Sequence, residues 1–221
     1  IKVTMIRGIL IATTIFAMWE ISCSFFDLPV FMLPPPSKVF ASIYVNREEL
    51  IVHASYTLVE ILASIAIGSL IGITTALIIS SSVTLKRWIM PILLASQSIP
   101  VFALAPLLIL WLGYGMISKI VIGVLIVFFP ITSNFTDALN KVPQELIDAG
   151  KTLNLSKIQL FYKIKIPSSL PGLCSGLRVA ACFAPIGAVV GEWIGGSTGL
   201  GSFMIYSLSL IHISEPTRQS S

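Results

Sequence analysis

The sequence is poor in charge and in side chains that bind metals or carry redox chemistry. Only 11% of its 221 residues are Asp, Glu, Lys or Arg, and 55% are hydrophobic. An ordinary soluble domain has roughly 25% charged residues. The three cysteines lack C-x-x-C spacing, so neither a disulfide framework nor a zinc site is indicated. With His53 and His212 as the only histidines, no catalytic cluster of a membrane-embedded enzyme is visible. The composition therefore predicts a protein whose solvent is lipid.

Five apolar runs are long enough to cross a bilayer as helices, since a spanning backbone must satisfy its own hydrogen bonds over about 20 residues. A sixth stretch, 202–213, is too short to cross. We therefore predict an all-α integral membrane protein with five transmembrane helices and a truncated sixth. The first run has a basic start like a signal peptide, but it is too long and no A-x-A-like cleavage site follows, which favours a retained helix. The five runs are approximately 8–26, 54–80, 88–111, 117–139 and 169–193.

Basic residues indicate the orientation, because Lys and Arg are retained on the cytosolic side. If the helices alternate, ten basic residues fall on one side, and Lys38, Arg47 and Lys119 fall on the other. We therefore expect a cytosolic N-terminus in a bacterial cytoplasmic membrane, with 140–168 also in the cytosol. The ten residues are Lys2, Arg7, Lys86, Arg87, Lys141, Lys151, Lys157, Lys163, Lys165 and Arg178.

The first half of the long polar segment 140–167 has the signals of a short helix. Pro143 suits a first helical position, and Glu145 and Asp148 place negative charge near the positive end of the helix dipole. Asn154 is the expected stop, because Asn readily adopts the left-handed cap conformation. An apolar edge at i, i+4 and i+7 is formed by Leu146, Gly150 and Leu153.

The second half of the segment predicts another short helix. Ser156 and Gln159 have capping-box spacing, and the apolar residues after them run until Pro167, which is expected to end the helix. The two halves together predict a compact helical pair on the inner membrane surface.

This segment resembles the cytosolic signature of permease subunits in binding-protein-dependent ABC importers, which reads E-A-A-x-x-x-G, nine residues, then I-x-L-P. The chain has Asp148-Ala149-Gly150 with Asn154 at the glycine position, then Ile164-Lys165-Ile166-Pro167. The order and the spacing agree. The departures are Asp for Glu, Gly for the second Ala, Asn for Gly and Ile for Leu. The resemblance implies ATPase-coupling roles for Glu145, Asp148, Ala149, Gly150, Leu153, Asn154, Ile164 and Pro167.

Further segments are similar to the subfamily that imports nitrate, sulfonates, taurine and pyrimidine precursors of thiamine, with a MetI-like transmembrane fold. They begin at Ser96-Gln97-Ser98-Ile99-Pro100 and include Trp111-Leu112-Gly113-Tyr114-Gly115, Gly176-Leu177-Arg178-Val179-Ala180 and Gly199-Leu200-Gly201. The resemblance implies a separate ATPase subunit, an external solute-binding protein, a second permease copy and surrounding lipid, with no nucleic acid. The segment 184–193 most resembles the thiamine-precursor branch.

The chain itself is not expected to bind ATP. Gly150-Lys151-Thr152 imitates the end of a phosphate-binding loop, but the required earlier glycine is Glu145. We expect no bound cofactor or metal, with ATP and Mg used by the partner.

Ionisable groups inside predicted spans are costly and are therefore candidates for function. Glu20 and Glu60 lie deep, and either a buried structural hydrogen bond or a place in the substrate path fits them equally. Asp137 and Glu192 lie near helix ends that water reaches. Prolines loosen the third span, and irregular backbone is tolerated where it lines a cavity. The candidate path residues are Ser96, Gln97, Ser98, Pro100, Asn134 and Glu192.

The leading hypothesis is thus a non-catalytic permease for a small anionic or heteroaromatic solute. An ion-driven secondary transporter with Glu20 or Glu60 as its ion site is the alternative. We predict a single transmembrane domain over 1–221, with its core at about 50–209. The resemblance ends near Tyr206, and 210–221 is expected to be non-native.

Overall fold

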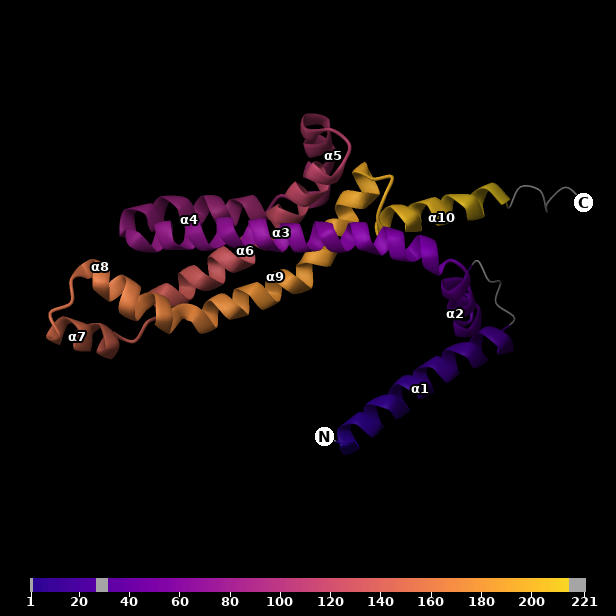
Figure 1. Cartoon of the computed structure of the whole chain (residues 1–221), viewed down its shortest axis with the longest axis horizontal. Helices are drawn as coiled ribbons and strands as arrows, with labels where there is room; N and C mark the ends of the chain where they lie inside the picture. Colours follow the sequence, from indigo (N-terminus) through magenta and orange to yellow (C-terminus); the bar gives the residue numbers. More distant parts are fainter. Residues whose placement is uncertain (1, 27–31, 215–221) are drawn as a thin grey trace, which may run out of the picture. The chain divides into compact units, whose positions relative to one another are not determined.

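The computed structural model describes residues 2–26 and 32–214, and every regular element among them is a helix (Figure 1). The chain forms two compact units, one of residues 1–52 with 207–221, the other of residues 53–206. The single domain predicted over 1–221, with its core at about 50–209, stays a prediction. The tail from residue 215 lies outside the described residues.

The first unit contains α1 (Lys2–Phe25), α2 (Pro36–Val45) and the start of α3 (Arg47–Ser81). Glu20 of α1 accepts hydrogen bonds from the backbone N–H of Ser37 (3.0 Å) and from its hydroxyl (2.7 Å). Ser37 lies in the first turn of α2, where backbone donors have no partner within the helix. Glu20 therefore makes structural hydrogen bonds, but it is half-buried and not buried as the first of its two considered roles required.

The second unit is built around three long helices, namely α3, α6 (Met116–Asn140) and α9 (Ile166–Gly195). Its main apolar cluster joins Val127 and Ile131 of α6 to Ala180 and Ala184 of α9. Small residues allow this close approach: a Cβ added at Gly176 would lie 3.0 Å from a backbone oxygen of α6. Figure 1 shows α6 and α9 running side by side.

The predicted span 88–111 is not one straight helix, which corrects the sequence prediction. The structure has α4 (Val83–Gln97) and α5 (Val101–Leu112), bent by 95°. Pro100 stands between them with an extended backbone, and it has no N–H with which to continue α4. The described residues thus contain four helices long and apolar enough to cross a membrane, or five if the bent pair counts as one span.

The bent pair still connects the two ends of the core. Within this unit, α3 begins at His53. The residues after α9 lie beside it, because the Gly199 N–H donates to Nδ1 of His53 (3.0 Å). The start of α6 lies there too, since Lys119 Nζ donates to the Thr198 carbonyl (2.7 Å). The C-terminal end of α3 lies instead at a groove with α8 (Lys157–Leu160). The α4–α5 pair therefore leads from one end of the core to the other.

A second correction concerns Pro167, which does not end a helix. The helical path from Lys157 runs unbroken for 39 residues to Gly195, through α8, the π-helical segment η1 (Phe161–Lys165) and α9. In η1 the N–H of Ile166 donates to the carbonyl of Phe161, one residue further back than in an α-helix. Pro167 follows directly as the second residue of α9, so the change of hydrogen-bond register coincides with the residue that has no N–H to donate.

Candidate functional site

The first element of the segment 140–167 is α7 (Gln144–Thr152), with Pro143 as its N-cap residue rather than its first helical residue. Asp148 accepts hydrogen bonds from Lys151 Nζ (2.8 Å) and from Gln144 Nε2 (3.0 Å). These bonds, that from Lys151 first, hold the pKa of Asp148 below its ordinary value of 3.8. The acid of the signature is therefore ionised at neutral pH, and it stays on the surface.

Asn154 ends α7 in the left-handed conformation with φ of 55°, as predicted. Two backbone bonds close the turn: Asn154 N–H donates to Lys151 (2.9 Å), and Leu155 N–H donates to Gly150 (3.1 Å). This pair of bonds is a Schellman motif. Only a residue that tolerates positive φ forms this turn without strain, and Asn does so at low cost.

The capping box after the turn is also confirmed. The Gln159 N–H donates to Oγ of Ser156 (3.3 Å), and the Ser156 N–H donates to Oε1 of Gln159 (2.9 Å). It fixes the start of α8 at Lys157, with Ser156 as the N-cap residue two positions after the left-handed Asn154. The backbone from 150 to 160 is therefore determined by local hydrogen bonds.

The two halves of the signature meet at Gly150 and Ile164. Gly150 is buried, and a Cβ built on it would lie 2.5 Å from Cδ1 of Ile164 and 3.5 Å from side-chain atoms of Leu155 and Leu160. The three residues of the predicted apolar edge therefore do not share one buried face. Gly150 faces inward, whereas Leu146 is 44% exposed and Leu153 is 75% exposed.

The remaining signature residues lie on the surface of this folded segment. Glu145, Ala149 and Pro167 are exposed, and Ile164 is half-buried. The segment therefore has an apolar interior, formed by Gly150 and Leu160, and an outer surface that combines a carboxylate with aliphatic groups.

The candidate path residues do not gather at one place. Ser96, Gln97, Ser98 and Pro100 are exposed around the bend between α4 and α5. Ser96 Oγ donates back to the Leu93 carbonyl (2.7 Å).

The other two path candidates lie elsewhere in the core. Asn134 of α6 is half-buried, and its Nδ2 donates to the Pro130 carbonyl (2.8 Å). Glu192 is fully buried, so the expectation that water reaches it was wrong. Its Oε1 accepts from the Thr57 hydroxyl (2.6 Å), and its Oε2 accepts from the Gly201 N–H (2.5 Å).

A buried ion pair lies beside Glu192. Lys119 Nζ is 3.0 Å from Oε1 of Glu60, and the two side chains are 2% and 0% exposed. The same ammonium donates to Thr198, so the cluster ties α3 and α6 to the turn after α9. A charge held in this way costs far less than an unpaired one, so the ion pair with Lys119 gives Glu60 a structural role.

Sequence reasoning missed this cluster because it assigned Lys119 to the external surface. The sequence did contain a signal for this ion pair, because Lys119 and Glu60 each lie inside a predicted apolar run. Opposite charges within membrane spans tend to pair. His53, which the sequence analysis considered only as a member of a catalytic cluster, accepts the N–H of Gly199 at the same end of the core.

Comparison with known proteins agrees with the fold. The family described as "Binding-protein-dependent transport system inner membrane component" matches residues 68–215. A probable ABC transporter permease protein of Haemophilus influenzae is 43% identical, over 93% of this chain and 84% of its own length. The formylaminopyrimidine transport permease protein of Halalkalibacterium halodurans is 39% identical, over 84% of this chain and 74% of its own. The taurine transport system permease protein of Escherichia coli is 28% identical, over 93% and 76%.

The chain therefore belongs to the inner-membrane components of binding-protein-dependent transport systems. It is a multi-pass permease of an ABC importer, of the subfamily indicated by its signature segments. The family match continues to residue 215, so the resemblance does not stop at Tyr206. The non-native character of 210–221 stays a prediction.

Proposed function

We propose that the segment 140–167 is the surface through which a separate ATPase subunit drives this permease. The observation that carries the proposal is a pair of exposed groups on a rigid base: Asp148 is 58% exposed and Leu153 is 75% exposed. Behind them, Gly150 is packed against Ile164. A docking element must transmit displacement to a spanning helix, and Ile164 belongs to the unbroken path from Lys157 to Gly195.

The other parts of the importer follow from this role. ATP and Mg are bound by the ATPase, and this chain catalyses no reaction. An external solute-binding protein delivers the solute, and two permease copies form one path. The segment 140–167 and the N-terminus each face the cytosol, because alternation of the predicted spans assigns ten basic residues to the cytosolic side.

We propose that the path lies along the α4–α5 bend, where Ser96, Gln97 and Ser98 expose polar groups next to Pro100. The solute is a small heteroaromatic compound of the pyrimidine-precursor type. This choice rests on relative similarity, since the relative named for formylaminopyrimidine transport is 39% identical and the relative named for taurine transport is 28% identical.

The test is uptake into proteoliposomes that contain the permease, its ATPase and its solute-binding protein. We expect uptake of radiolabelled formylaminopyrimidine to require ATP on the loop side and to persist with a protonophore. Unlabelled taurine in excess should not compete. Uptake without the ATPase that collapses with the protonophore would refute the importer mechanism.

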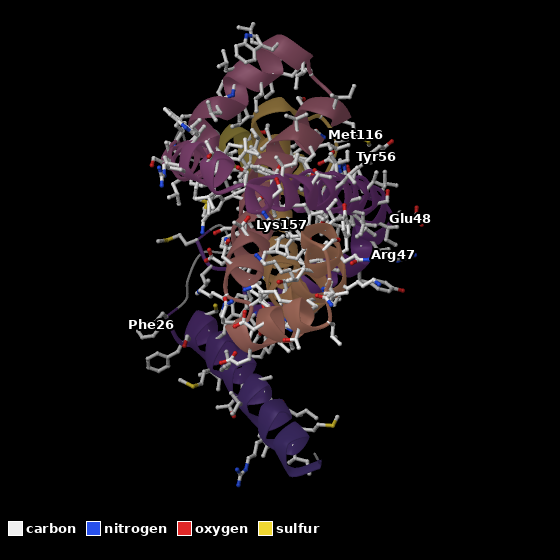
Figure 2. The ribbon with its side chains drawn as sticks, turned by 90° about the vertical axis from the view of Figure 1, so that its left-hand side faces the viewer. Phe26, Arg47, Glu48, Tyr56, Met116 and Lys157 are labelled. Atoms are coloured by element: carbon white, nitrogen blue, oxygen red, sulfur yellow. The ribbon has the colours of Figure 1, made fainter. Side chains whose placement is uncertain are left out.

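The docking role is tested separately with Asp148→Arg. We expect this variant to lose stimulation of uptake by ATP while it still inserts and folds. The matched control is Glu48→Arg, the same charge reversal at an exposed residue in the first turn of α3, which is labelled in Figure 2. Equal uptake by the two variants would contradict the docking role.

A further inference from the structure

A groove of about 680 Å³ lies between the C-terminal end of α3 and the α7–α8 segment. Its α3 wall includes Leu77 and Ile78, and its opposite wall includes Phe161. Figure 2 views the molecule from the end at which α7 and α8 lie and labels Lys157. Neither the family nor the coupling role assigns this groove an occupant.

The polar part of the groove is strongly basic. Lys151, Lys157 and Lys165 line it, and no acidic residue does so among those described. Lys151 is paired with Asp148, whereas Lys157 and Lys165 have no ion pair within residues 2–26 and 32–214. The groove therefore offers two uncompensated ammonium groups to an anion.

A second polar group in the groove also lacks a partner. The hydroxyl oxygen of Ser80 is buried and makes no hydrogen bond with any described residue. Ser80 lines the same groove. A buried hydroxyl without a partner is uncommon in folded proteins, and a bound polar group would satisfy it.

The apolar part of the groove is provided by a helix that is apolar enough to cross a membrane. Leu77 and Ile78 lie within the apolar helix Arg47–Ser81, and Ile78 is 54% exposed. These two residues belong to a helix apolar enough to cross a membrane, whereas Leu153 is 75% exposed on the loop. The occupant of the groove must therefore have both an anionic head and a hydrocarbon part.

We propose that this groove binds an anionic phospholipid. The headgroup phosphate lies between Lys157 and Lys165, and an acyl chain lies along Leu77 and Ile78. Basic pockets between transmembrane helices on the cytosolic side are a recognised form of lipid site. The proposal rests on the cytosolic orientation of the loop given under the proposed function, and it stands independently of the docking role of Asp148.

The test is lipid retention by the full-length chain, measured by native mass spectrometry from mixed micelles with equal phosphatidylglycerol and phosphatidylcholine. We expect preferential retention of phosphatidylglycerol. Lys157→Gln with Lys165→Gln should weaken it about 30-fold, since each lysine near a lipid surface contributes about 1 kcal/mol. The control, Lys141→Gln with Lys163→Gln, removes the same charge from two exposed residues that do not line the groove, and it should retain the preference.

Three outcomes would overturn the proposal. Equal loss in both double variants would indicate only general attraction to basic charge. Displacement of phosphatidylglycerol by millimolar inorganic phosphate would indicate a site for the free anion. If Lys157→Gln with Lys165→Gln leaves lipid retention unchanged but weakens binding of the ATPase, the groove is a protein interface. If the double variant fails to fold, the single variants Lys157→Gln and Lys165→Gln replace it, each with about a fivefold loss expected.

Discussion

The ammonium of Lys119 lies 3.0 Å from a carboxylate oxygen of Glu60, and both side chains are buried in the core. Removal of the lysine alone leaves an uncompensated carboxylate among apolar helices. We expect Lys119→Met to lower the free energy of unfolding by about 3–5 kcal/mol. Thermal unfolding of the purified chain, followed by tryptophan fluorescence, measures the change.

The double variant Lys119→Met with Glu60→Gln separates charge from packing. It removes both partners, so it should recover part of the stability lost by Lys119→Met. Lys163→Met is the control for loss of an exposed lysine and should have little effect. A melting curve of Lys119→Met that matches the unchanged protein would show that the pair does not stabilise the fold.

The left-handed turn at Asn154 gives a second prediction. Asn154→Gly should leave stability within about 1 kcal/mol, because glycine adopts positive φ freely. Asn154→Val should cost about 1–2 kcal/mol, since a β-branched residue is strained at φ of 55°. The ratio of solute imported to ATP hydrolysed should fall for the valine variant only. Identical ratios for the two variants would contradict the requirement for this turn.

The contact between Gly150 and Ile164 predicts a dependence on size. Gly150→Ala should change stability by no more than about 1 kcal/mol, because the end of the Ile164 side chain can rotate away and alanine favours the helix. Gly150→Leu should disrupt the segment, since Leu155 and Leu160 close the remaining space. Limited proteolysis of the loop in detergent compares the two variants. Equal protection of both would indicate that the contact is loose.

The lowered pKa of Asp148 predicts the direction of its pH dependence. The Lys151 and Gln144 bonds stabilise the ionised form, so their contribution is fully present above the ordinary value of 3.8 and is lost as pH falls through the folded-state pKa. No Asp148-dependent change is therefore expected between pH 5 and pH 8. Titration of carbon-13-labelled aspartate, assigned with Asp148→Asn, measures the pKa.

Variants of Lys151 and Gln144, the two hydrogen-bond donors to Asp148, show which of them lowers its pKa more. Lys151→Met should raise the pKa of Asp148 more than Gln144→Leu, because the hydrogen bond from Lys151 has the larger effect. A larger rise with Gln144→Leu would show that the charged partner is not the main cause.

Local signals predicted the loop best. The left-handed stop at Asn154 and the capping box at Ser156 and Gln159 depend on residues a few positions apart, and the structure confirms both. The end assigned to the second helix was wrong because Pro167 is acceptable in the first turn of α9 once η1 changes the hydrogen-bond register. Whether the helix continues past Pro167 depends on this hydrogen-bond register, which the amino-acid composition does not reveal.

By itself the sequence determined the class of protein, the approximate spans and the conformation of the segment 150–160, because apolar length and capping chemistry act over short distances. Only the tertiary structure decided the 95° bend at Pro100, the burial of Glu192 and the pairing of Lys119 with Glu60. Lys119 and Glu60 are 59 positions apart. The packing of α3 against α6 brings them together, and burial then makes their charges dependent on each other.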